Sequence, residues 1–113
     1  MNGTYLRFYV HENVKHRHRL LYEWLLEHAK SLGVHGGSAF RSIAGFGRHG
    51  VLHEQHFFEL AGNLTVEVEF ALSVAQADRL LESLRAEGVD LIYARSPVEL
   101  GVIESKARSG PQQ

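Results

Sequence analysis

The sequence contains no cysteine, and this absence excludes several kinds of chemistry at once. A disulfide framework, a zinc site built on thiolates and a cysteine nucleophile all require that residue. Long apolar runs are also missing, because no stretch approaches the ~20 residues that a transmembrane helix needs. The first residues, "MNGTYLRFYV", lack the pattern of a signal peptide. We therefore expect a cytoplasmic protein that does not itself span a membrane.

The charges nearly balance, with a formal net charge of −1. No field of one sign would draw nucleic acid, so we expect no nucleic-acid partner. A length of 113 residues favours one domain with one core. We place that domain at residues 1–103. Residues 104–113 are polar and have no pattern, which predicts a disordered tail.

Hydrophobic periodicity predicts an α+β ferredoxin-like sandwich of order βαββαβ, in which two helices cover one face of an antiparallel four-stranded sheet. Ser73 and Gln76 fit a capping box at the start of the second helix, and Pro97 is expected to stop the last strand. Residues 12–18 are expected to be a charged connection. The expected strands are residues 4–11, 36–47, 64–72 and 90–95, and the expected helices are residues 19–33 and 74–87.

The alternation of residues along the strands also predicts which side chains lie on the face of the sheet that the helices do not cover. Ile92 is expected under the helices, together with the apolar positions of the first and third strands. Aromatic side chains mixed with charges of both signs are typical of a contact between subunits, although a solvated face with weak ion pairs is the alternative. We expect a closed, symmetric oligomer. The interface candidates on this uncovered face are Tyr5, Arg7, Tyr9, Glu67, Glu69, Tyr93 and Arg95.

The segment "RSIAGFGRHG" at residues 41–50 is a candidate anion site. Glycines let backbone N–H groups approach a ligand, and arginine grips phosphate or carboxylate. The segment is neither a Walker motif nor a dinucleotide fingerprint, and composition alone slightly favours a flexible strand end with a bulge. The parity of the strand points Arg41 at the subunit interface. The ligand-binding candidates are Arg41, Gly45, Phe46, Gly47, Arg48 and His49.

Residues 48–63 have no sustained period, and such a long loop in a compact domain is typically functional. His49, His53 and His56 in or beside this loop could bind a divalent metal such as Zn, Cu or Ni. Elsewhere, His16 and His18 are expected to be exposed, and His28 to lie at the edge of the core. We expect no enzyme, because no nucleophile motif is present and nearby arginines would keep the Glu67 and Glu69 carboxyls ionised.

Three stretches resemble an uncharacterised PII-like family labelled domain of unknown function 190. They are "LRFYV" (6–10), "LLYEWLLEHAKSLGVHGGSAFRSIAGFG" (20–47) and "LTVEVEF" (64–70). Residues 45–48 are similar to the glycine-phenylalanine-glycine-arginine stretch of PII signalling proteins. In those proteins the stretch leads into the T-loop, which docks on transporters and enzymes. The resemblance implies a homotrimer, with clefts between subunits where PII proteins bind adenine nucleotides.

The resemblance thus implies a regulatory protein that binds a small effector, with an adenine nucleotide as the candidate. The loop at 48–63 would engage a protein partner, for which a membrane transporter is the default. However, residues 84–93 are short, acidic and free of lysine where PII proteins have a lysine-rich loop. The resemblance therefore does not extend to ATP binding, and a smaller anion, a nucleotide monophosphate or a metal stays open as the ligand. The alternative is a metal-binding trimer resembling divalent-cation tolerance proteins, with His49, His53 and His56 as ligands.

Overall fold

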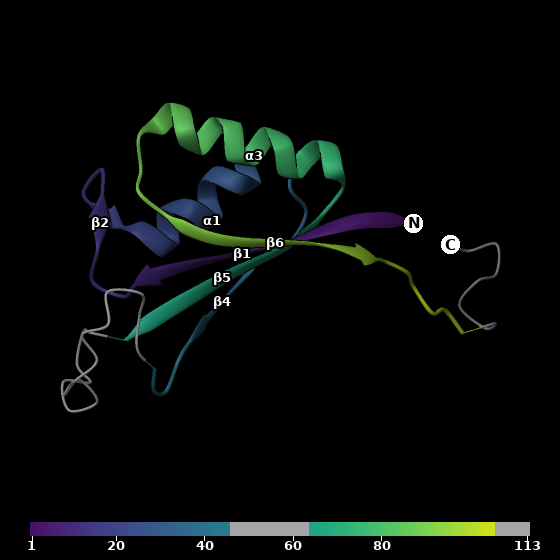
Figure 1. Ribbon diagram of the computed structural model, residues 1–113, viewed down its shortest axis with the longest axis horizontal. Coiled ribbons are helices and arrows are strands. Elements are labelled where there is room, and N and C mark those ends of the chain that lie inside the picture. The colour runs from purple at the N-terminus through teal and green to yellow at the C-terminus, as the bar shows by residue number, and fades with distance from the viewer. Residues whose placement is uncertain (46–63, 106–113) are drawn as a thin grey trace.

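A computed structural model describes residues 1–45 and 64–105. Strands β4, β5, β1 and β6, in that order, form one antiparallel sheet, and β2 and β3 form a separate hairpin. Helices α1 and α3 lie on the same side of the sheet (Figure 1). The predicted α+β sandwich of order βαββαβ is confirmed. The elements are β1 (Asn2–His11), β2 (Lys15–His16), β3 (Arg19–Leu20), α1 (Leu21–Ser31), β4 (Ser38–Arg41), β5 (Thr65–Leu72), α3 (Val74–Glu87) and β6 (Ile92–Glu99).

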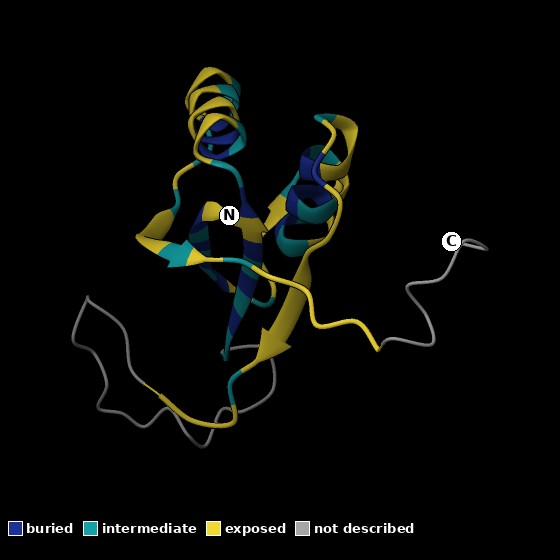
Figure 2. Cartoon of the chain, turned by 90° about the vertical axis from the view of Figure 1, so that its right-hand side faces the viewer, coloured by how far each residue is buried: buried dark blue, intermediate teal, exposed yellow. Residues whose placement is uncertain are grey.

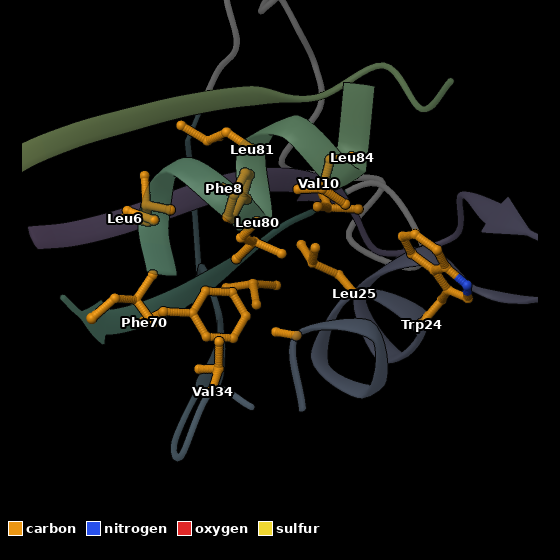
Figure 3. Close-up of a cluster of buried hydrophobic side chains, with 14 of the residues drawn as sticks. Leu6, Phe8, Val10, Trp24, Leu25, Val34, Phe70, Leu80, Leu81 and Leu84 are labelled. Atoms are coloured by element: carbon orange, nitrogen blue, oxygen red, sulfur yellow. The ribbon is translucent and has the colours of Figure 1, made fainter. Parts of the chain in front are cut away.

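The core lies between the helices and strands β1 and β5. Alternate residues of these two central strands are buried, as the sequence pattern predicts. In Figure 2 the buried parts of the helices face the sheet. Figure 3 shows Leu25 of α1 and Leu80 and Leu84 of α3 in one cluster of buried side chains with Phe8 and Phe70 of the sheet. The parity predicted for β1 and β5 is therefore confirmed, and within residues 1–45 and 64–105 no helix covers the opposite face of these strands.

The helix ends explain how the two helices are held in place. Ser73 Oγ accepts from Gln76 N at 3.1 Å, and Gln76 Oε1 accepts from Ser73 N at 3.1 Å, which confirms the capping box. Helix α1 has no side-chain cap; instead Leu21 N donates to Val14 O at 2.8 Å. The residue that precedes the hairpin thus satisfies a donor that helix starts leave open. None of the helices in the described ranges is long and apolar enough to cross a bilayer.

Three predicted element boundaries are wrong. Of the strand expected at 36–47, the described residues 36–45 form a strand only at Ser38–Arg41. The connection expected at 12–18 contains β2. Strand β6 continues through Pro97, which was expected to stop it. The reason is that β6 is an edge strand paired only with β1, and an edge strand tolerates a residue that donates no hydrogen bond on its outer side.

Candidate functional site

The face of the sheet opposite the helices, here called the open face, is organised in rows across the strands. Directly paired residues of antiparallel strands point to the same face. One row therefore joins Phe40, Glu67, Tyr9 and Ile92. The exposed apolar side chains of Phe40 and Ile92 extend this face beyond the residues predicted for it. The next row joins Ser38, Glu69, Arg7 and Ala94.

The predicted face of β6 is wrong. Tyr93 pairs with Phe8 and Arg95 pairs with Leu6, and both partners are buried on the helix side. The Tyr93 ring lies 6.1 Å from the Phe8 ring, and Arg95 Nη1 lies 2.9 Å from Asp78 Oδ1 on α3. Tyr93 and Arg95 therefore share the covered face. Ile92, expected under the helices, belongs to the open face.

Arg7 is the charged centre of the open face. Its Nε lies 3.0 Å from Glu69 Oε2 and 3.7 Å from Glu67 Oε1. The Tyr5 hydroxyl donates to Glu69, and the Arg7 guanidinium lies 5.5 Å from the Tyr5 ring centre. Interactions with the hydroxyls of Tyr5 and Tyr9 raise the pKa of Arg7 above its ordinary value. One permanently charged guanidinium thus faces two carboxylates, and Arg7 Nε is buried without a hydrogen bond of good geometry.

The described residues on the two sides of segment 46–63 are joined to each other and to β1 by hydrogen bonds. We call this group the loop base, and it is made of Glu12, Arg41, Ser42, Leu64 and Thr65. Both Ser42 N and Ser42 Oγ donate to Thr65 O, at 2.9 and 3.0 Å. Glu12 N donates to Leu64 O at 3.0 Å. Arg41 Nε and Nη2 donate to Glu12 Oε1 and Oε2, at 2.8 and 3.4 Å. Residues 41–42 and 64–65, which lie on the two sides of segment 46–63, are therefore neighbours, at the end of the sheet where β1 ends (Figure 1).

The described residues include only part of the predicted ligand site. Arg41 pairs with Val66, so it belongs to the covered face, and its predicted direction toward the open face is wrong. Gly45 is exposed, and a Cβ added there would meet nothing within 4 Å. The other candidates lie outside the described residues: Phe46, Gly47, Arg48, His49, His53 and His56. Within residues 1–45 and 64–105, no group of three His, Cys, Asp or Glu side chains could hold a metal ion.

A further cluster, which the sequence patterns did not predict, joins the hairpin to the end of α3. The Glu87 carboxylate accepts from Arg17 Nε and lies 3.0 Å from His16 Nε2. The His16 ring packs edge-on against Trp24, with 4.5 Å between ring centres. His16 was expected to be exposed, but its side chain is only 21% exposed. We call His16, Arg17, Trp24 and Glu87 the hairpin cluster.

Trp24 also connects the hairpin cluster to the helix pair. The His28 ring stacks on Trp24 at 4.6 Å, and His28 Nε2 lies 2.7 Å from Ser83 Oγ on α3. His28 is partly buried, which confirms its predicted place at the edge of the core. One indole is therefore in contact with an imidazole from the hairpin and with another from α1.

Glu87 should make the stability of the protein depend on pH. Its bonds with His16 and Arg17 lower the pKa of Glu87. Folding therefore favours the carboxylate, and the stabilisation is present above the unfolded carboxyl pKa of about 4.3. It is lost as the pH falls through the folded-state value. We expect urea unfolding to show wild type losing its advantage over Glu87→Gln in that acidic range. Glu82→Gln, at an exposed position of α3, should show no such trend, and a difference for Glu87→Gln that is constant with pH would contradict the assignment.

Comparison with known proteins finds a family model and a relative that each match most of the chain. The family model DUF190, described as "Uncharacterized ACR, COG1993", matches residues 3–100. The UPF0166 protein of Aquifex aeolicus (strain VF5) is 32% identical over 96 residues, covering 78% of this chain and 91% of that protein.

Solved structures show the same fold. CPII from Thiomonas intermedia K12, bound to ADP and bicarbonate, matches with a TM-score of 0.58 and 19% identity, over 90% of this chain and 91% of that one. Another CPII structure holds ADP, AMP and bicarbonate. A PII-like signalling candidate from Thermus thermophilus matches with a TM-score of 0.59 and 18% identity, over 87% of this chain and 88% of that one.

Proposed function

This chain belongs to the DUF190 family, and from that premise we propose that it is a PII-like regulatory protein that binds a small effector at clefts between the subunits of a homotrimer. The proposed effector is an adenine nucleotide. The loop at 48–63 would then engage a protein partner in the cytoplasm, with a membrane transporter as the first choice. No catalytic step is part of this proposal.

The loop base is the observation that carries the proposal. Hydrogen bonds from Ser42 to Thr65 and from Glu12 to Leu64 hold the chain to the sheet on both sides of residues 46–63. An effector that binds beside such a base can shift the conformations of the loop while the sheet stays unchanged. This is the property that a regulatory loop needs.

Two further observations support the effector and the assembly. CPII, which has the same fold, was solved with ADP and bicarbonate, which favours an adenine nucleotide as the first ligand to test here. The open face combines Arg7 and its carboxylates with the exposed side chains of Phe40 and Ile92. Such a mixture of aromatic, apolar and paired charged groups is typical of a subunit interface, and closed symmetry is the usual result of self-association.

Calorimetric titration with ADP, AMP and ATP tests the proposed effector site. We expect wild type to bind ADP, and Arg48→Ala to bind it at least about tenfold more weakly, because a hydrogen bond to a charged group contributes about 1.5–3 kcal/mol. Arg79→Ala removes the same charge from an exposed position on α3 and should bind as wild type does. Equal binding by Arg48→Ala and wild type, or no binding of any nucleotide, would remove the proposed site.

A further inference from the structure

Hairpin β2–β3 concentrates basic side chains in an uncommon backbone conformation. Residues 15–19 are Lys, His, Arg, His and Arg. Arg17 and His18 form its two-residue turn with φ of 54° and 67°. Turns of this kind favour Asn and Gly, because the left-handed conformation strains a long side chain such as arginine. Strain of this kind is typically kept where the side chain has a role, so the choice of Arg17 needs an explanation.

The hairpin cluster resembles an anion-binding site in which the Glu87 carboxylate takes the place of the anion. Glu87 interacts with both His16 and Arg17, and the pairing of His16 with Arg19 places a third basic side chain on the same face of the hairpin. The Glu87 side chain is 18% exposed, whereas that of Arg17 is 67% exposed. The bond to Glu87 uses Nε of Arg17, so an anion can approach its guanidinium from solvent.

The surroundings of the hairpin cluster add a reason for this arrangement. The turn after Glu87, residues 88–91, contains Asp90 and no basic residue. Any phosphate bound at this end of the molecule therefore needs its positive charge from another segment. The hairpin packs against α3 through Glu87 and lies at the end of the molecule where β1 ends (Figure 1). It is thus a basic segment that contacts the end of α3, just before a turn without basic residues.

We propose that hairpin β2–β3 binds a phosphate group, and that the Glu87 carboxylate is an internal occupant which the phosphate displaces. The planar guanidinium of Arg17 suits phosphate oxygens. Arg19 supplies further positive charge, and the His16 ring offers a nitrogen on the same face of the hairpin. The inference rests on the proposed function, since the phosphate is that of the nucleotide effector. It deepens that function by naming a second segment that holds the ligand.

Titration with inorganic pyrophosphate and with ADP tests this site, using Trp24 fluorescence. Trp24 is the only tryptophan and contacts His16, so displacement of Glu87 should change its emission. We expect Arg17→Asn to weaken pyrophosphate binding about tenfold, since one charged hydrogen bond is lost. Glu87→Gln should tighten binding severalfold, because the competing charge is gone. Weaker pyrophosphate binding by Arg17→Asn and tighter binding by Glu87→Gln cannot both arise from unfolding. Asparagine also adopts the left-handed conformation of this turn more readily than most residues do.

Matched controls separate this inference from the proposed function. Glu82→Gln removes a carboxylate from the same helix at an exposed position and should leave pyrophosphate binding unchanged. If Arg17→Asn and Glu87→Gln bind pyrophosphate as wild type does, the hairpin site is wrong, while ADP binding that depends on Arg48 still upholds the proposed function. Wild type that binds pyrophosphate through Arg17 but does not bind ADP upholds the hairpin site and contradicts the nucleotide effector. Absence of pyrophosphate binding in both wild type and Glu87→Gln overturns the hairpin site.

Discussion

Replacing Phe8 by alanine is expected to lower the free energy of unfolding by about 3–5 kcal/mol. Phe8 is 1% exposed, and its ring lies 6.1 Å from the rings of both Phe70 and Tyr93. Truncation removes these contacts and leaves a cavity on the central strand of the sheet. Since small domains have only about 5–15 kcal/mol of stability in total, urea unfolding followed by circular dichroism should show a much lower midpoint.

Phe40→Ala is the matched control, because it removes the same atoms from a side chain that is 54% exposed. Its cost should stay below about 1 kcal/mol at protein concentrations where the chain is monomeric. Similar losses for the two variants would mean that Phe8 does not lie in the core. The pair therefore also tests which face of the sheet the helices cover.

The central strands and the start of α3 were predictable because their residues have one buried face each. In β1 and β5, every second side chain is buried against the helices, so alternation in the sequence reports the structure directly. Ser73 and Gln76 are three residues apart, and the capping box that they form is local. Such features need no knowledge of distant parts of the chain.

Strand β6 shows where alternation stops being informative. It is an edge strand, and residues 92–97 are exposed on both faces. Without burial, an apolar residue is no guide to the covered face, so Ile92 suggested the wrong parity for Tyr93 and Arg95. The correct parity follows from pairing with β1, which aligns Tyr93 with the buried Phe8.

The hairpin cluster was out of reach of sequence patterns for another reason. Glu87 and His16 are 71 positions apart, and residues 15–19 have no apolar alternation that predicts a hairpin. The two segments meet only because α3 packs on the sheet and ends beside the start of α1. A polar contact of this kind is fixed by the fold as a whole. In the loop base, likewise, Arg41 was a visible candidate but its partner Glu12 was not.

Replacing Arg7 by glutamate is expected to dissociate the proposed trimer into monomers. The substitution would put a third carboxylate beside Glu67 and Glu69, which Arg7 now faces at 3.7 and 3.0 Å. Like charges brought together in an interface cost several kcal/mol, because neither water nor a counter-charge is left to screen them. Sedimentation equilibrium of wild type and variant at the same concentration measures the change in mass.

Arg79→Glu makes the same charge change on the exposed surface of α3, on the other side of the molecule from the open face, and should keep the mass of wild type. A trimer retained in Arg7→Glu would show that subunits meet elsewhere than on the open face. A wild type that sediments as a monomer would contradict the trimer itself. In that case Arg7 and its two carboxylates would interact only within one chain. Arg7→Glu should then lower the free energy of unfolding without changing the mass, because the repulsion among the three carboxylates does not depend on a second subunit.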